Sequence, residues 1–221
     1  MRTQINSAVG LRHEDLPHDK LFWSSRSPAC RKVMIVAHEL GVAGRLERER
    51  VSVGSALPNE QVMAVNPLNK IPTLVTAYGK AIYDSRVICR YLISIADAAG
   101  QLLPVGERGI DTAVWEAAGD GLADLSLVLL GESRRPEGSR SDPHVRAFAL
   151  KMDTSLKQLE ARVDELAAEG VTLGTLATAV AVAHVEFRHT HFLERCPNLL
   201  QWLSGMKSRP SFEQTEFEDI V

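Results

Sequence analysis

The spacing of hydrophobic and polar positions changes near residue 100, and this change divides the chain. Before it, short strand-like and helix-like stretches alternate; beyond it, only the three- and four-residue spacing of amphipathic helices occurs. Between them lies "QLLPVGERG", which is rich in turn formers. We predict a flexible lead-in, an α/β domain, a linker and an all-helical domain at residues 1–18, 19–100, 101–109 and 110–221.

Within the α/β part, the pattern predicts the order strand, helix, strand, irregular piece, strand, strand, helix. "KLFWS" (Lys20–Ser24) is short and aromatic, and "ERVSV" (Glu49–Val53) alternates, so both are predicted strands. Apolar positions from Cys30 to Leu40 form one helical face that ends at Gly41. Two short apolar runs flank Gly79-Lys80, which predicts a hairpin, and a helix begins near Asp84-Ser85. We interpret "RLERER" (Arg45–Arg50) as a solvated connector.

Over residues 110–221 the hydrophobic spacing predicts helices only. Their expected ranges are 110–132, 144–169, 173–190 and 197–207. The fold class is therefore α/β followed by all-α.

Composition narrows the functional classes. With 221 residues, 45% hydrophobic and 24% charged, the chain resembles an ordinary globular protein. A net charge of −3 gives no reason to expect a nucleic-acid partner, which would favour a strongly basic face. No apolar run reaches the roughly 20 residues of a membrane helix, and no signal-peptide pattern occurs. Three cysteines fit a reducing compartment, so we expect a cytoplasmic protein.

The stretch "SSRSPACR" (Ser24–Arg31) places three hydroxyls and a thiol at a predicted helix start. Ser27 precedes Pro28, and proline suits the first helical position, so Ser27 is a natural N-cap. The same helix start attracts an anion through its free N–H groups and dipole. Ser27-x-x-Cys30 also has the shape of a thiol–disulfide motif that has lost its first cysteine. Such a site would suit a thiol supplied by a ligand.

Two further turns carry candidate binding residues. In "NKIPTLV", Pro72 directly precedes a predicted strand, where its missing N–H is tolerated. A cis bond at Pro72 would leave the Ile71 backbone free to pair with an extended ligand, although trans is far commoner. Asp84-Ser85 either caps the following helix or holds an amine and a carboxylate of one ligand.

Taken together, the three turns and their order resemble the thioredoxin-like half of cytosolic glutathione transferases. The matching segments are "SPACRKVMIVAHELG", "NPLNKIPTLV" and "YDSRVICRYL", and the likeness extends over residues 19–213. The resemblance implies a thioredoxin-like domain with a mixed four-stranded sheet, followed by a helical domain that lines a pocket for an electrophile. It further implies a bacterial-type, serine-type enzyme similar to the theta, tau or zeta classes.

The resemblance also implies roles for individual residues. Ser27 would stabilise the thiolate of glutathione, with Ser24 and Ser25 as alternatives, and Ile71 would pair with the cysteinyl backbone beside a cis Pro72. The remaining glutathione-binding residues would be Lys70, Asp84 and Ser85. Cys30 lies one residue away from the position of the cysteine in beta-like members, so a beta-like mechanism is not expected. Tyrosine-type members use a tyrosine hydroxyl at the end of the first strand, and this chain has no tyrosine before Tyr78.

Two positions depart from the family pattern. Asn69 replaces a common glycine, which can alter the loop that carries Lys70. Thr175 replaces an aspartate that usually closes a capping box with Thr172, which predicts a weaker helix start.

In the helical part, Trp115 is a candidate either for the lining of the electrophile pocket or for plain core. Asp120 is a candidate residue for contact with a ligand bound in the neighbouring subunit. His189 and His191 lack metal-site spacing, so we expect no metal.

The leading functional hypothesis is a glutathione S-transferase that conjugates glutathione to a small hydrophobic electrophile. It would act in detoxification as a homodimer, without nucleic acid or membrane partners. The alternatives are a glutathione-dependent peroxidase, thiol transferase or isomerase, for which Cys30 makes a redox role conceivable, and a non-catalytic glutathione-binding protein on the same scaffold.

Overall fold

The computed structural model describes residues 18–97 and 100–220. The predicted lead-in therefore lies, apart from His18, outside the described residues.

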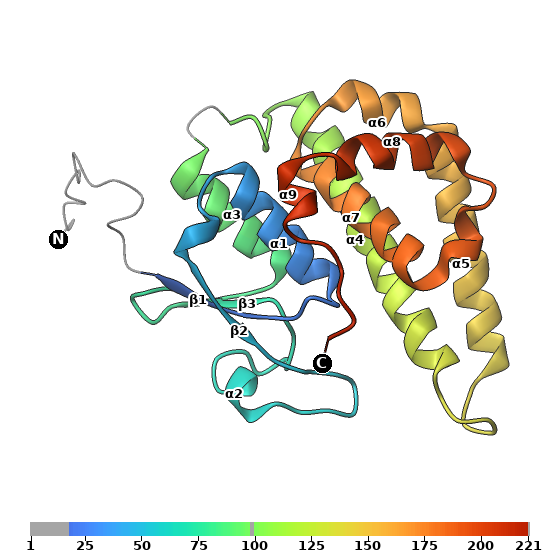
Figure 1. Cartoon of the computed structure of the whole chain (residues 1–221), viewed down its shortest axis with the longest axis horizontal. Coiled ribbons are helices and arrows are strands. Elements are labelled where there is room, and N and C mark those ends of the chain that lie inside the picture. Colours follow the sequence, from blue (N-terminus) through green and yellow to red (C-terminus); the bar gives the residue numbers. More distant parts are fainter. Residues whose placement is uncertain (1–17, 98–99, 221) are drawn as a thin grey trace.

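A four-stranded mixed sheet forms the centre of the N-terminal domain (Figure 1). Its strands, in the spatial order β2-β1-β3-β4, are Leu46–Arg50, Asp19–Trp23, Thr73–Val75 and Ala81–Ile82. β1 pairs in parallel with β2 and antiparallel with β3, and β4 pairs antiparallel with β3. The predicted hairpin is present, with Gly79 at φ 80° in its turn. This arrangement confirms the predicted fold class.

Helices cover both faces of the sheet. α1 (Pro28–Glu39) and α3 (Ser85–Ala96) lie on the face toward the helical domain, whereas the short α2 (Glu60–Met63) lies on the other (Figure 1). Val62 of α2 packs there with Phe22 and Val51 as a small second core. The three candidate turns, at Ser27, Pro72 and Asp84, thus lie at the ends of elements in a sheet that is packed on both faces.

The prediction for the second strand was wrong. The strand was predicted at Glu49–Val53, but β2 runs over Leu46–Arg50, so "RLERER" after Arg45 forms a strand and not a connector. β2 is an edge strand that pairs only with β1, and of its residues only Leu46 is buried. Charged side chains are typical of sheet edges because they oppose pairing with other chains. Because four of the five residues of β2 are charged, the hydrophobic pattern did not predict this strand at Leu46–Arg50.

The helical domain begins with α4 (Glu107–Ser133), three residues earlier than predicted. The predicted helix over 144–169 is two helices, α5 (Asp142–Ala161) and α6 (Val163–Glu169). They are separated at Arg162, whose backbone φ of −117° leaves the helical range. The remaining elements are α7 (Leu173–His189), the 3₁₀ turn η3 (Thr190–Leu193), α8 (Pro197–Lys207) and α9 (Pro210–Glu213).

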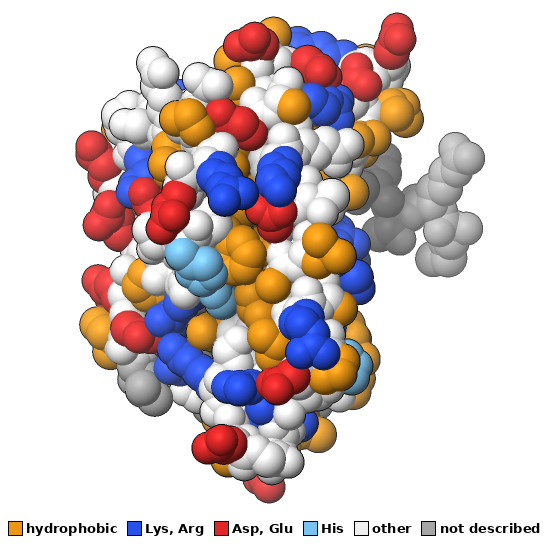
Figure 2. All heavy atoms as spheres, turned by 90° about the vertical axis from the view of Figure 1, so that its right-hand side faces the viewer, with side chains coloured by type: hydrophobic (Ala, Val, Ile, Leu, Met, Phe, Trp, Pro, Cys, Tyr) orange, Lys and Arg blue, Asp and Glu red, His pale blue; other side chains and the backbone are white. Residues whose placement is uncertain are grey.

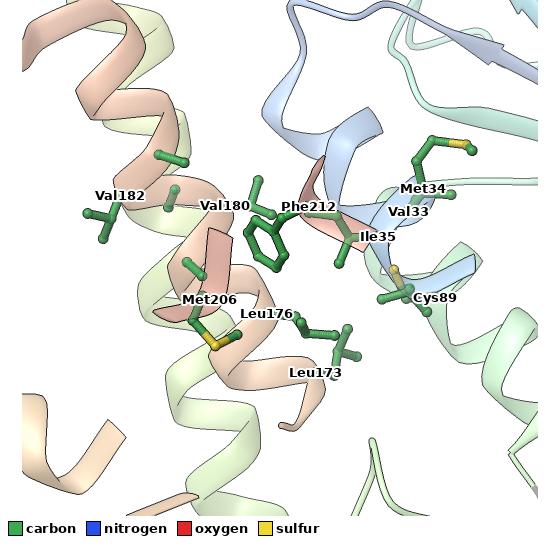
Figure 3. Packing of buried hydrophobic residues seen from close by; sticks show 14 of the residues in the cluster. Val33, Met34, Ile35, Cys89, Leu173, Leu176, Val180, Val182, Met206 and Phe212 are labelled. Atoms are coloured by element: carbon green, nitrogen blue, oxygen red, sulfur yellow. The ribbon is translucent and has the colours of Figure 1, made fainter. Parts of the chain in front are cut away.

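One continuous hydrophobic core joins the two domains. Figure 3 shows Phe212 of α9 between Ile35 of α1 and Val180 of α7, and all three are essentially buried. α1 is therefore packed against the helical domain through the second half of its length.

The expectation of a weak start for α7 was also wrong. Thr172 accepts a hydrogen bond from the Thr175 N–H at 3.3 Å, and Thr175 Oγ1 accepts one from the Thr172 N–H at 2.9 Å. Threonine thus closes the capping box in place of the aspartate.

Charges of both signs are interspersed with apolar side chains on the helical face shown in Figure 2. None of the helices formed by the described residues is long and apolar enough to cross a membrane.

Candidate active site

The turn between β1 and α1 places Ser27 at the start of a helix. Ser27 has extended backbone angles (φ −90°, ψ 120°), and its Oγ accepts a hydrogen bond from the Cys30 N–H at 3.3 Å. Pro28 occupies the first helical position, as expected. The accepted bond uses only an oxygen lone pair, so the hydroxyl hydrogen remains able to donate.

The three serines of this turn differ in accessibility. Ser24 and Ser25 are each 7% exposed, whereas Ser27 is half-buried. Ser24 Oγ accepts from the Arg26 N–H at 3.3 Å. Ser25 Oγ donates to the Glu218 carbonyl at 3.1 Å and accepts from Arg50 at 3.0 Å. Ser27 is therefore better placed than its neighbours to donate to a ligand.

Cys30 does not supply a thiolate in this fold. Its side chain is fully buried, and burial raises the pKa of the thiol to about 12, against the smaller opposing effects of the Ser27 hydroxyl and the Ser24 backbone. A thiol with this pKa stays protonated at neutral pH, and only the thiolate is a strong nucleophile.

The sheet register brings the other predicted turns to the same edge. Phe22 near the end of β1 is opposite Thr73 at the start of β3, and Leu74 of β3 is opposite Ile82 at the end of β4. Antiparallel pairing therefore gathers the end of β1, the start of β3 and the end of β4. Ser27, Pro72 and Asp84 follow or precede these three strand ends by a few residues.

The loop before β3 has the conformation that the ligand-pairing hypothesis requires. The Ile71–Pro72 peptide bond is cis. The carbonyl of Lys70 accepts from Thr73 Oγ1 at 2.8 Å and from Asn66 Nδ2 at 3.2 Å, while the Lys70 side chain is exposed. The loop is thus fixed through its backbone, with its ammonium group free to meet a carboxylate.

Asn69 fits the position where relatives often have glycine. Its φ is 52°, in the left-handed region that glycine and, more rarely, asparagine adopt. Its amide also accepts from the Asn59 N–H at 2.9 Å and donates to the Leu57 carbonyl at 3.0 Å. Asparagine thus keeps the loop conformation and ties the loop to the segment before α2.

Of Asp84 and Ser85, only Asp84 caps α3. Asp84 is the N-cap of α3, and its Oδ1 accepts from the Arg86 N–H at 3.0 Å while the residue stays exposed. Ser85 is the first helical residue and is 6% exposed. A second carboxylate oxygen of Asp84 remains for a ligand amine.

Comparisons with known proteins agree with this geometry. The family description "Glutathione S-transferase, N-terminal domain" matches residues 26–95. The uncharacterized GST-like protein YibF of Escherichia coli (strain K12) is 32% identical, and the match covers 89% of this chain and 98% of that protein. This chain belongs to the glutathione S-transferase superfamily.

Solved structures of other superfamily members show the same architecture. A glutathione transferase family member from Pseudomonas fluorescens Pf-5, with bound glutathione, has a TM-score of 0.86 and 28% identity, covering 90% of this chain and 99% of its own. A glutathione S-transferase from Methylobacillus flagellatus KT, also with glutathione bound, has a TM-score of 0.78 and 32% identity, covering 90% and 98%.

In this transferase-family member, a partly buried ion network that was not predicted from the sequence joins α1, α3 and α4 around the site. Lys32 of α1 is 1% exposed, and its Nζ contacts both carboxylate oxygens of Asp120 on α4 at 2.7 and 2.8 Å. Asp120 also accepts from Arg86 Nε of α3 at 2.8 Å, and Arg90 pairs with Glu116 at 2.6 Å. The network fixes the starts of α1 and α3 relative to α4. That Asp120 reaches a ligand in the neighbouring subunit stays a prediction; within this chain its oxygens accept from Lys32 and Arg86.

Trp115 lies in the helical core. It is 4% exposed, the Arg162 guanidinium covers its ring at 4.3 Å, and the Gly174 backbone packs against its Cβ. This position matches the alternative of plain core, and we do not assign Trp115 to an electrophile pocket. Among the described residues, no group of three or more potential ligands is arranged for a metal ion.

Proposed function

We propose that this chain is a glutathione S-transferase in which the Ser27 hydroxyl stabilises the glutathione thiolate. The observation that carries the proposal is the geometry of Ser27, whose accessible hydroxyl caps α1 at the sheet edge where the Pro72 and Asp84 turns meet. Glutathione bound to superfamily members of known structure supports the choice of ligand.

The energetics of this arrangement are sufficient. Free thiols ionise near pH 8.5, and lowering the pKa by about two units requires about 2.7 kcal/mol in favour of the thiolate. A hydrogen bond to a charged group contributes about 1.5–3 kcal/mol, and the dipole of α1 adds up to ~1 kcal/mol. Ser27 stays protonated throughout, and the thiol proton passes to solvent.

The remaining site residues hold the tripeptide. The Ile71 backbone, next to the cis Pro72, pairs with the cysteinyl unit. Lys70 meets the glycine carboxylate, and Asp84 and Ser85 hold the γ-glutamyl end. The thiolate then attacks an electrophilic carbon: a sulfur–carbon bond forms, and the leaving group departs with its electron pair.

Homodimer formation is part of the proposal. Exposed apolar side chains occur on α3 and along α4, with exposed fractions between 40% and 67%: Val87, Ile110, Val114, Leu127 and Val128. We propose that some of them are covered by the second subunit.

Two features that had favoured the alternatives are removed, while the glutathione half-site, which serves a peroxidase, thiol transferase or isomerase equally, is unchanged. A redox role for Cys30 required a reactive thiol, and this thiol is buried with a raised pKa. The non-catalytic hypothesis depended on Asn69 and Thr175, and both residues preserve the local structure that the family residue would provide.

Replacing Ser27 tests the proposal. Ser27→Ala should lower turnover of glutathione with an activated aryl halide by about 10- to 100-fold, the equivalent of one charged hydrogen bond. The dissociation constant for glutathione, measured by calorimetry, should change little because the other contacts remain. Ser24→Ala is the matched control in the same turn and should retain most activity. Unchanged turnover in Ser27→Ala would reject the assignment.

A further inference from the structure

The last described residues of the chain cross from the helical domain to the turn that carries Ser27. We call Thr215–Ile220, which follows α9, the C-terminal strap. In Figure 1 this red segment runs down past the start of α1 and ends beside the sheet. It belongs to neither a helix nor a strand, so its position depends on side-chain and single backbone contacts.

Two contacts hold the strap to α7. The Phe217 ring stacks on Phe187, with centroids 5.3 Å apart and an interplanar angle of 7°, and its edge meets His184 at 5.2 Å. Arg188 donates two hydrogen bonds to the carboxylate of Asp219, at 3.0 and 2.8 Å. Paired, bidentate contacts of this kind fix orientation as well as distance.

The other side of the strap holds the turn. Ser25 Oγ donates to the Glu218 carbonyl at 3.1 Å, and the Glu218 N–H donates back to the Ser25 carbonyl at 3.4 Å. Arg50, at the end of β2, donates to Ser25 Oγ at 3.0 Å and to the Ile220 carbonyl at 3.3 Å. The Arg31 guanidinium of α1 lies over the Phe217 ring at 4.4 Å.

The strap and the turn also share the walls of one cavity of about 430 Å³, which include Ser24, Ser25, Arg31, Arg50 and strap residue Glu218. Within the turn, one backbone bond, from Ser27 N–H to the Ser24 carbonyl at 3.2 Å, links Ser27 to Ser24, which directly precedes the strap-bound Ser25.

We infer that the C-terminal strap is a positioning element for the thiolate-stabilising turn, and that Ser25, Phe217 and Asp219 are positioning residues. The strap fixes Ser25 against both domains, and Ser25 in turn fixes the turn that directs Ser27 Oγ. This inference rests on the proposed function. The hydrogen bonds of the other proposed glutathione-binding residues, such as Lys70 and Asp84, go to neighbouring residues of their own turns and not to the strap.

The test is the pKa of the enzyme-bound glutathione thiol, read from thiolate ultraviolet absorbance against pH. The variants are Ser25→Ala, Asp219→Ala and a chain that ends at Thr215. Each should raise the bound-thiol pKa toward its free value, by up to about one unit, and lower kcat/KM at pH 6.5 by up to about 10-fold. Glutathione affinity from calorimetry should change less than about threefold, since the binding residues are untouched.

The matched control is Arg209→Ala. Arg209 of α9 forms an equally bidentate pair with Glu39 of α1, at 2.9 and 2.7 Å, and also crosses the domain interface, but at the opposite end of α1. It should leave the bound-thiol pKa unchanged. A pKa that is lowered in the wild type and equally lowered in all strap variants overturns this inference alone. A wild-type pKa equal to that of free glutathione overturns the proposed function together with it.

Discussion

Two helices of this protein begin at hydroxyl side chains that make the same cap, yet their surroundings differ completely. At α7, Thr172 is fully buried and reciprocates with Thr175, whose hydroxyl also donates to the Gly170 carbonyl at 2.8 Å. At α1, Ser27 is half-buried, and Cys30 at the reciprocal position is a buried thiol.

The difference shows what separates a structural cap from a functional one. In the closed box of α7 the polar groups satisfy one another inside the core, so every bond contributes to stability. At α1 the helix uses the oxygen of Ser27, and our proposal assigns its hydrogen to the ligand. A hydroxyl residue at the same helical position stabilises the fold at α7 and, under this proposal, a ligand anion at α1.

The largest effect should come from separating capping and donation at Ser27. Aspartate caps helices as well as serine does, but it cannot donate and repels a thiolate. Ser27→Asp should keep the unfolding free energy within about 0.5 kcal/mol of the wild type. Loss of about two units of thiol-pKa depression should lower turnover at pH 6.5 by about 50-fold, because the thiolate fraction falls from about one half to about one hundredth.

Ser27→Thr is the control, because threonine retains both the cap and the hydroxyl. It should keep at least about a tenth of the activity. If Ser27→Asp remained active, or if Ser27→Thr lost as much activity as the aspartate variant, donation by this hydroxyl would not be the source of activity.

The opposite outcome is expected at Thr172. Thr172→Ala removes the cap and leaves the buried Thr175 N–H without its acceptor, which should lower the unfolding free energy by about 1–3 kcal/mol. Turnover per folded molecule should not change. Chemical denaturation at matched protein concentration measures the loss, with exposed Thr154→Ala on α5 as a control that stays within about 0.5 kcal/mol. An equal loss in both variants would show that the box contributes nothing.

Features encoded by neighbouring residues were predictable from the sequence. Ser27-Pro28 and Asp84-Ser85 each mark a helix start through chemistry confined to a few positions, and both helices begin there. The Gly79 hairpin is likewise a local signal.

Features that depend on distant partners were not predictable. β2 is a strand only because β1 supplies its ladder, and its charged side chains alone suggest a solvated segment. Lys32 and Asp120 are 88 positions apart, and Ser25 and Glu218 are 193 apart. No periodicity connects such residues, so the ion network and the C-terminal strap become visible only in three dimensions.

The smallest effect should appear as a pH dependence that belongs to α7 and not to the α1 turn. His184 is fully buried, and its Nδ1 is 2.8 Å from Ser126 Oγ. Burial, reinforced by the positive charges of Arg188, His189 and Arg31, lowers the pKa of His184 to about 3. In the unfolded chain a histidine titrates near 6.5. Below that pH the unfolded state binds a proton that the folded state rejects, so stability falls as pH falls.

Between pH 7 and 5, His184 should cost the folded state about 2 kcal/mol of unfolding free energy, at up to about 1.4 kcal/mol per pH unit. His184→Gln should therefore flatten the pH dependence of denaturation by this amount. Ser126→Ala removes the same hydrogen bond but keeps the imidazole, so it should lower stability at pH 7 while preserving the slope. If the unfolding free energy of His184→Gln depended on pH as steeply as that of the wild type, the imidazole would already be protonated in the folded state. The interior of α7 would then not exclude a charge in the way that distinguishes it from the α1 turn.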